Sequence, residues 1–297
     1  MKFSGIGGQA VLEGIMMRNG EQYAVCVRKP DGTIETTVEK IVPFSKKHPW
    51  AAWPFIRGTV SLVESLRTGM KTLMWSASFE EDENGEQIEL KKSEEVWTVI
   101  LAIVMALSIF VILPTVLVNF LKRWIESNVL ISLIEGVLRL LLFIGYIAAV
   151  SRVPDIQRTF MYHGSEHKCI NCIENGKPLT VENVMASSKE HRRCGTSFIL
   201  QVVLISIIVF MIIRVDQLWL KILVRIVMIP VIAGLSYELL RFTGSHNGKF
   251  AYILSRPGMW MQALTTKEPT EDMAEVAIKA VESVFDWRAF LQENFTS

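Results

Sequence analysis

The chain has 297 residues, of which 50% are hydrophobic, and its formal net charge is only +1. Such a small charge provides no global basic field, which argues against a nucleic-acid-binding protein. The chain has four cysteines, too few for a disulfide-stapled secreted framework of this length. Its first residues contain one lysine and no sustained apolar run, so we expect no cleavable signal peptide.

Residues 1–79 are predicted to form a small cytosolic α+β region. The glycine-rich start, GGQAVLEGIMMRNG, matches neither the Walker nor the Rossmann phosphate-binding pattern, and it favours a tight turn followed by a strand. β-prone residues flank the turn-forming sequence Pro-Asp-Gly at 30–32 and predict a hairpin. Residues 57–77 predict an amphipathic helix that packs on this hairpin or lies on a membrane surface. Its helically spaced apolar residues are Val60, Val63, Leu66, Met70 and Leu73.

An acidic stretch, residues 80–95, is predicted to be a polar linker without a site. After it come four long apolar runs, at 96–121, 129–150, 196–213 and 218–240. A membrane-spanning helix needs roughly 20 apolar residues, and the first and third runs exceed what a soluble core needs. Prolines within such runs are tolerated in lipid. We therefore expect a mainly α integral membrane protein, with a four-helix transmembrane domain at 96–241.

The basic residues of the connecting loops predict the topology. The middle loop, residues 151–195, is rich in lysine and arginine, and Lys91 and Lys92 precede the first run. The loops after the first and third runs carry Lys122, Arg123 and Arg214. The positive-inside rule then places the middle loop in the cytoplasm, and an even number of spans places both termini there. In that reducing compartment, cysteines bind metals more often than they form disulfides.

Three charged residues fall within the apolar runs. Glu135 and Arg139 lie four residues apart in the second run, and Arg225 lies in the fourth. Charges at such depth are expensive and face a bundle interior, a cavity or one another, so we expect Glu135 to pair with the arginines. Two interpretations stay open: a polar cavity that opens towards the cytoplasm, or an ion pair that fixes helix register. A transporter would depend on these charges alone, and four spans without a visible repeat disfavour it.

The middle loop contains three of the five histidines and three of the four cysteines. In the sequence HGSEH, His163 and His167 are four residues apart and would share one face of a helix, although Gly164 weakens helix formation. Glu166 lies between them, which gives the H-x-x-E-H order of inverted zinc proteases. In those enzymes the glutamate acts as general base on a metal-bound water.

A second pattern competes for the same loop. Cys169-x-x-Cys172 followed by His191-x-x-Cys194 has the spacing of a structural Cys3His zinc site. In the catalytic alternative, His191 or Cys194 joins His163 and His167, and water fills an open position. A metal-free interpretation also stays open, because cysteines are often small buried apolar residues.

Residues 242–297 are predicted to form a cytosolic helical tail. An apolar stripe there should dock a helix on another cytosolic element. The stripe consists of Met273, Val276, Ala277, Ala280, Val281 and Val284.

Four stretches of the chain resemble the YqhQ-like family of bacterial membrane proteins. They are GGQAVLEGIMMR, EGVLRLLLFIGYIAAVSRVPDIQRTFMYHGSEHK, HRRCGTSF and RPGMWMQALTTKEPT. The resemblance covers most of the chain and implies a bacterial cell membrane location. The family is labelled a predicted metal-dependent enzyme, which implies a metal but no particular reaction.

The family's site motifs match this chain residue by residue. His163, Glu166, His167 and Lys168 match HGxEHK, and His191, Arg193, Cys194 and Gly195 match HPRCGTSF with Arg192 in place of proline. Cys169 and Cys172 are not part of these motifs. The resemblance therefore favours a metal site of His163, His167, His191 and Cys194, with Glu166 as base or as a group that orients a ligand.

The leading hypothesis is a metal-dependent multi-pass membrane hydrolase. A divalent metal such as zinc would activate water, and Glu166 would carry the proton for a small-molecule substrate whose class the sequence does not name. The alternative is a non-enzymatic factor in membrane-protein biogenesis or assembly, in which the cluster is a structural clamp. Its partners would be the lipid bilayer and another membrane protein.

Overall fold

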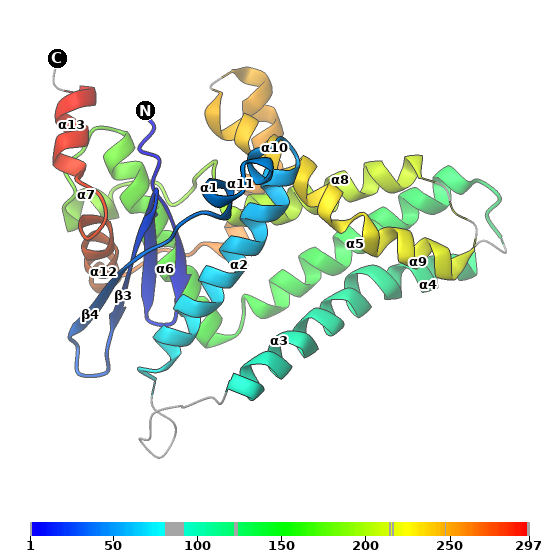
Figure 1. Cartoon of the computed structure of the whole chain (residues 1–297), viewed down its shortest axis with the longest axis horizontal. Helices are drawn as coiled ribbons and strands as arrows, with labels where there is room; N and C mark the ends of the chain where they lie inside the picture. Colours follow the sequence, from blue (N-terminus) through cyan, green and yellow to red (C-terminus); the bar gives the residue numbers. More distant parts are fainter. Residues whose placement is uncertain are drawn as a thin grey trace.

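A computed structural model describes residues 2–80, 92–121, 124–213, 215, 217–246 and 248–295. One part of the molecule is a small sheet covered by helices, and the other is a set of long helices that extends away from it (Figure 1). Most of the predicted linker at 80–95 lies outside the described residues, as do Lys91, Lys122, Arg123 and Arg214.

The sheet is a four-stranded antiparallel meander of β1 (Gly7–Val11), β2 (Gly14–Asn19), β3 (Gln22–Arg28) and β4 (Ile34–Lys40). The predicted hairpin is confirmed: β3 and β4 pair across the Pro-Asp-Gly turn, with Gly32 at φ 82°. The glycine-rich start differs from the prediction, because a strand also precedes the tight turn. Glu13 makes that turn at φ 46°, and β1 pairs with β2 on its other side.

Helices cover both faces of the sheet. One face packs against α6 (Pro154–Glu174) and α12 (Glu271–Glu282), and the predicted stripe of α12 is buried there. Two short helices, α7 (Val181–Met185) and α13 (Trp287–Phe295), complete this side. The other face carries Tyr23 and Val25, which pack with Trp75 near the end of α2 (Ile56–Ala77). The chain reaches α2 through α1 (Phe44–Lys47) and a 3₁₀ turn, η1 (Pro49–Ala52).

Three described helices are long and apolar enough to cross a membrane, and a bent pair makes up to four. The first candidate span joins α3 (Lys92–Leu107), a π-helical turn η2 (Ser108–Ile112) and α4 (Leu113–Leu121). The second and third are α5 (Asn128–Val150) and α8 (Gly195–Ile212). The last helix of this part, α11 (Lys249–Thr265), packs on α8.

The predicted fourth span is two helices, α9 (Leu218–Val227) and α10 (Ile229–Ser245), bent by 44°. Pro230 stands in the first turn of α10, and its missing N–H cannot continue the hydrogen bonds of α9. The π-helical turn of the first span likewise ends at Ile112, two residues before Pro114. Prolines therefore interrupt these runs without ending them.

A buried polar cluster joins the four candidate spans. Glu135 of α5 accepts hydrogen bonds from Thr115 of α4 at 2.9 Å and from Lys221 of α9 at 2.9 Å. The same carboxylate contacts Arg225 and lies 3.5 Å from Arg139. From α8, Ser206 accepts from Arg139, and the ring of Phe210 lies beneath both guanidinium groups. The charges expected to pair thus meet at one level of the bundle.

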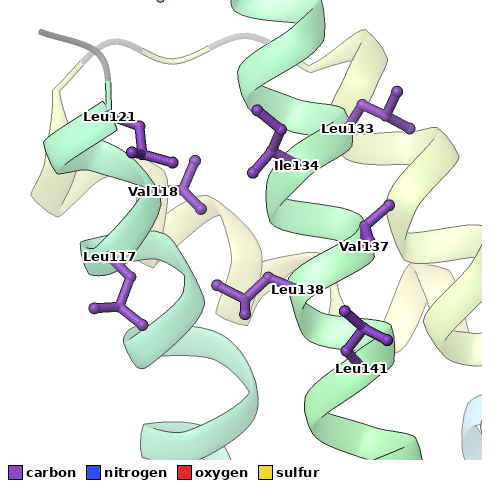
Figure 2. Close-up of a pocket in the computed structure, with 8 residues that line it drawn as sticks. All are labelled: Leu117, Val118, Leu121, Leu133, Ile134, Val137, Leu138 and Leu141. Carbon is purple, nitrogen blue, oxygen red and sulfur yellow. The ribbon is translucent and has the colours of Figure 1, made fainter. Parts of the chain in front are cut away.

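An apolar cavity of about 570 Å³ lies between α4 and α5. Its lining consists only of aliphatic side chains, which Figure 2 shows projecting from the two helices. They are Leu117, Val118, Leu121, Leu133, Ile134, Val137, Leu138 and Leu141. Without a polar group to orient a ligand, this cavity has the character of a lipid-facing surface rather than of a reaction site.

Replacing Glu135 with alanine should destabilise the bundle. The substitution removes the carboxylate that two buried arginines and the half-buried Lys221 contact, and breaking a buried ion pair costs about 3–5 kcal/mol. We expect the free energy of unfolding in detergent micelles to fall by that order. Leu141→Ala changes a side chain that is 61% exposed and should stay within about 0.5 kcal/mol of the wild type. Equal stability of the Glu135 variant and the wild type would contradict a role for the cluster in holding the spans.

Candidate metal centre

One face of α6 carries the chemical groups of the site. His163, Glu166 and His167 stand at positions i, i+3 and i+4, followed on the same face by Glu174. The helix begins with Pro154 in its first turn, where a missing N–H costs nothing, so the helix predicted for HGSEH is confirmed. Gly164 belongs to it for a packing reason: a Cβ atom there would collide with the carbonyl oxygen of Lys267 in the tail.

Both imidazoles of α6 are held by backbone carbonyls. His163 Nδ1 lies 2.8 Å from the carbonyl oxygen of Thr265, and His167 Nδ1 lies 2.6 Å from that of Lys189. A carbonyl only accepts, so each Nδ1 carries the proton and each Nε2 keeps its lone pair free. Histidines that bind metals are oriented by this kind of contact.

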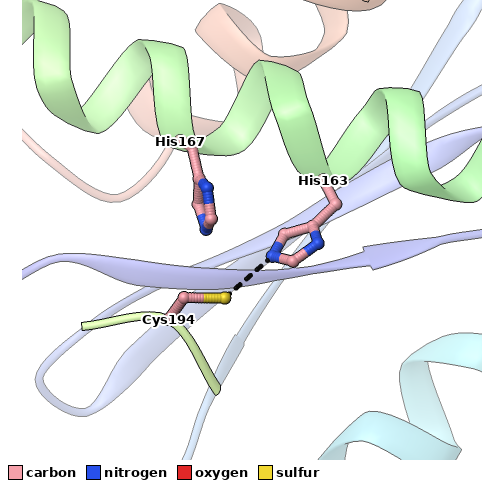
Figure 3. Close-up of side chains that lie close together, drawn as sticks. All are labelled: His163, His167 and Cys194. Atoms are coloured by element: carbon pink, nitrogen blue, oxygen red, sulfur yellow. Dashed lines mark hydrogen bonds between the residues drawn. The ribbon is translucent and has the colours of Figure 1, made fainter. Parts of the chain in front are cut away.

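Cys194 completes the group from another part of the chain. It is the N-cap residue of α8, where its sulfur accepts a hydrogen bond from the Thr196 amide at 3.4 Å. Its Sγ lies 3.1 Å from His163 Nε2, and Figure 3 shows both beside His167. The three ligand atoms all lie within 4.8 Å of one another, so His163, His167 and Cys194 could hold a metal ion.

The donor set fits a zinc-like ion. Zinc binds nitrogen at about 2.0–2.1 Å and sulfur at about 2.3 Å, so its tetrahedral ligands stand about 3.5 Å apart. The 3.1 Å between His163 Nε2 and Cys194 Sγ is close to that separation, and two imidazoles with one thiolate match zinc's preference. Three protein ligands leave a fourth position for water or substrate, as catalytic zinc sites do.

Glu166 faces the same cavity. Its side chain is buried, and its Oε1 accepts a hydrogen bond from the Gly8 amide at 2.9 Å. Burial raises the pKa of this carboxyl, against the smaller opposing effects of His163 and the Gly8 amide. A Cβ atom on Gly8 would collide with the carbonyl oxygen of Met16 and lie 3.1 Å from the Glu166 carboxyl carbon, so only glycine fits.

The cavity has a volume of about 150 Å³. Residues from the N-terminal segment, from α6 and from the start of α8 line it. They are Phe3, Ile6, Gly7, Gly8, His163, Glu166, His167, Ile170, His191, Arg193, Cys194 and Gly195. Histidines, a carboxylate, a thiol and a guanidinium thus share one small space.

His191 lines this cavity from its edge. Its ring centroid lies 5.6 Å from that of His167, and His191 is not among the three residues whose ligand atoms converge. Its Nε2 accepts from Arg193 at 3.2 Å, and burial lowers its pKa, which keeps the ring neutral. Gln262 of α11 fixes the backbone of His191 through bonds of 2.9 and 2.7 Å. Among the described residues, the group that could hold a metal therefore includes Cys194, and His191 stays a predicted ligand at the edge of the cavity.

A buried ion pair supports that edge of the cavity. Glu174 contacts the Arg193 guanidinium and accepts bonds from the amide and hydroxyl of Ser4 at 2.9 and 2.8 Å. Burial raises the pKa of this carboxyl, but the neighbouring His191, the Ser4 bonds and the Arg193 charge outweigh it and lower the pKa to about 2. The N-terminal segment is thereby tied across the cavity.

Two further polar residues of α6 hold the chain segment between α7 and Cys194 close to the site. Lys168 donates to the carbonyls of Met185 and Ser187 at 2.8 and 2.9 Å. Asn171 donates to those of Ser188 and Glu190. Buried donors need acceptors, and these four carbonyls lead the chain back towards Cys194.

Cys169 and Cys172 lie elsewhere. Both are buried in the apolar core between α6, α12 and the sheet, and both are free thiols. Burial raises the pKa of Cys169 well above its usual range, so its thiol stays protonated. Within the described part of the chain, neither residue joins the group of His163, His167 and Cys194. Glu135, Arg139 and Arg225 of the candidate spans likewise do not line this cavity.

The sequence did not identify several residues that build the site. Gly8, Ser4 and Glu174 received no functional assignment, and neither did Gln262 or Thr265. Gln262 and Thr265 lie in the stretch RPGMWMQALTTKEPT, so the family resemblance was the one signal that marked them. Thr265 acts through its carbonyl oxygen, a group that every residue has, so its residue type carries no sign of this role.

Replacing Glu174 with glutamine should weaken the fold in a pH-dependent way. A carboxyl whose pKa falls from about 4.5 to about 2 on folding stabilises the protein above pH 4.5, and that stability is lost as the pH falls towards 2. The difference corresponds to about 3 kcal/mol at neutral pH. We expect the gap between the melting temperatures of wild type and variant to be largest at pH 7 and to narrow between pH 5 and 2. Glu182→Gln, on the exposed side of α7, provides the matched control. A gap that stays constant with pH would contradict this account.

Comparisons with known proteins agree with the sequence resemblance. Residues 53–287 match the model of a family described as "Protein of unknown function (DUF1385)". The chain is 36% identical over 300 residues to "Uncharacterized protein YqhQ" of Bacillus subtilis (strain 168), covering 97% of this chain and 94% of that protein. Neither description names an enzymatic activity, and no solved structure matches the chain. The extent of both matches shows that the chain belongs to the DUF1385 family and is YqhQ-like.

Proposed function

We propose that this protein is a metal-dependent hydrolase of the bacterial cell membrane, with zinc or a similar divalent ion on His163, His167 and Cys194. One observation carries the proposal. Two imidazoles whose Nδ1 atoms are bonded to carbonyls converge with a thiol on a cavity that also contains a buried carboxylate. Structural zinc needs four protein ligands, whereas this group offers three.

Each polar residue of the cavity would have a separate role in hydrolysis. A bound divalent ion would supply a Lewis acid that makes water a nucleophile near neutral pH. Glu166 would accept and return a proton, a role that suits a carboxyl whose pKa is raised by burial. Gly8 holds that carboxylate through its amide. His191 and Arg193 face the remaining space and offer donors to a polar substrate group.

The membrane location and topology belong to the same proposal. The apolar lengths of α3–α4, α5 and α8 support spans, and the bent pair α9–α10 supports a fourth. The basic residues of the loop at 151–195 favour the cytoplasmic side for this loop and for both termini. Cys194 caps α8, so the cavity would stand at the cytoplasmic end of a span.

A second function is favoured by a specific contact. His163 and His167 belong to α6, and Cys194 begins α8, so an ion among them would also tie the sheet region to the candidate spans. This is what a structural clamp does in a non-enzymatic biogenesis or assembly factor that binds another membrane protein. The two functions differ in whether the ion keeps an exchangeable position.

Purified wild-type protein is expected to contain about one divalent ion per chain, and removing a ligand should reduce this content. His163→Ala and Cys194→Ser each delete one converging ligand atom, and we expect metal affinity to fall more than tenfold. Elemental analysis after dialysis against a weak chelator measures this. His246→Ala, an exposed histidine next to α10, should retain the wild-type content. Metal-free wild-type protein, or equal content in all variants, would contradict the metal centre.

Glu166→Gln separates catalysis from clamping. The amide keeps the size of the side chain and removes no ligand, so metal content should stay at the wild-type level. Hydrolysis of a panel of fluorogenic peptide and ester substrates should fall by about 10²–10⁴-fold, the contribution of a general base. In the cobalt-substituted wild type, acetohydroxamate should change the visible spectrum by taking the open position. An unchanged spectrum, together with the absence of hydrolysis by wild type, would favour the clamp.

A further inference from the structure

The segment between β4 and the middle of α2 contacts a candidate span well inside its apolar run. Thr59 of α2 donates to the carbonyl oxygen of Pro230 at 2.8 Å. Gly58 packs so closely on α10 that a Cβ atom there would lie 3.0 Å from the Cα of Gly234. Gly234 precedes the end of α10 at Ser245 by a helix length of roughly 16 Å. If α9 and α10 cross the bilayer, the amino end of α2 lies at the same depth as Gly234.

The surface of this segment suits lipid. Trp53 and Phe55, just before α2, are 62% and 53% exposed, and Val63 and Leu66 on α2 are 60% and 64% exposed. Together with Ile56 and Met70, these exposed apolar residues of α2 share one face, since their spacing follows successive helical turns. The opposite face is occupied by α10 at one end and by the sheet at the other, where Leu12 donates to Ser76. An exposed aromatic and aliphatic face that continues the surface of a span is the face that bilayer lipid covers.

The charges of the segment are placed accordingly. Residues 49–66 contain two charged residues, Arg57 and Glu64. Glu238 of α10 binds Arg57 through two bonds of 2.7 and 2.5 Å, and Glu64 accepts the Phe44 amide at 2.5 Å. Glu238 also accepts the Phe55 amide at 3.2 Å. Charged side chains are tolerated near lipid when they form a bidentate ion pair whose hydrogen-bonding groups are satisfied. Arg67 and Lys71 come later, on the half of α2 that returns to the sheet.

The path of the chain makes this segment a loop into the membrane. It leaves the sheet at Lys40 and turns at Phe55, whose φ of 69° is unusual for a bulky side chain. The carboxyl-terminal half of α2 then packs on β1, with Gly69 against the side chain of Gln9. Figure 1 shows α2 rising from the sheet region to the α10 end of the long helices.

We infer that residues 49–66 form a re-entrant element, whose exposed face is embedded in the lipid of the leaflet next to the cavity. The sequence predicts a cytosolic region at 1–79 whose helix packs on the hairpin or lies on a membrane surface, and the inference places the start of that helix deeper, within the lipid. The inference rests on the membrane location proposed above. It adds a contact between the bilayer and the domain that contributes Gly8 to the cavity, because α2 packs on β1 and α10 at once.

Single cysteines in the full-length protein test this inference. The substitutions are Val63→Cys and Leu66→Cys on the exposed apolar face. Ser65→Cys is the matched control, because Ser65 is exposed but lies off that face, between the contacts with α10 and with the sheet. Asp31→Cys at the hairpin tip gives the reaction rate of a position in water, and Val104→Cys on α3 gives that of a position in a candidate span. The four native cysteines are buried, so unmodified protein serves as the blank.

The proteins are placed in phosphatidylcholine–phosphatidylglycerol nanodiscs and treated with a water-soluble maleimide. We expect positions 63 and 66 to react at least about tenfold more slowly than 65 and 31, as Val104→Cys does. Spin labels at 63 and 66 should collide with oxygen more than with a water-soluble nickel complex.

Three outcomes would contradict the inference. Fast maleimide reaction at positions 63 and 66, with position 104 protected, would overturn the re-entrant element and leave the membrane location intact. Fast reaction at 104 as well would overturn the membrane location itself. Protection in cells but fast reaction in nanodiscs would identify a protein partner on this face and also overturn the inference.

Discussion

Satisfying the buried polar face of α6 is the constraint on which the rest of the structure depends. From Tyr162 to Glu174 the helix is almost wholly buried, and polar groups at that depth need partners. Ser165 bonds to the Tyr162 carbonyl within the helix, but the partners of the charged and amide side chains lie far away in sequence. The N-terminal segment bonds to Glu166 and Glu174, the loop after α6 bonds to Lys168 and Asn171, and α11 bonds to His163. The contacts that hold the fold therefore also orient the ligands of the candidate metal centre.

Periodic patterns predicted the elements well, because they depend on local geometry. The β3–β4 hairpin, the helix at 57–77 and the stripe from Met273 to Val284 each repeat with the period of the element they form. The zinc-knuckle interpretation of Cys169 and Cys172 treated spacing as if the chain were a loop. Once α6 continues to Glu174, Cys169 stands two residues beyond His167 and faces the other side of the helix. A predicted helix that continued from His163 to Glu174 would have placed the two histidines and Cys169 on different faces.

The rest of the site could not be predicted from local pattern, because it is formed by backbone atoms and by distant segments. The carbonyls of Thr265 and Lys189 set the imidazole tautomers, and no residue type marks a carbonyl for that role. The sequence shows a glycine at position 8, but only the structure shows why: Met16 and Glu166 approach so closely that a side chain would not fit. The bend between α9 and α10 has a visible cause in Pro230, whereas its size depends on packing.

The two polar clusters of the molecule restrain the same pair of helices from opposite ends. Pro154 starts α6 four residues after α5 ends, and Cys194 caps α8, so the distance from His163 to Cys194 depends on how α5 and α8 lie together. They approach closely at Gly136, where a Cβ atom would collide with Ile207. Further along, Arg139 bonds to Ser206 across the same interface, and Glu135 ties both to α9. Metal–ligand distances in protein sites stay within about 0.2 Å of their usual values, whereas apolar helices can slide along one another. The candidate histidine–cysteine centre is shared between the ends of α5 and α8, so it requires a fixed register of these two helices. The polar contacts around Glu135 and Arg139 provide that register.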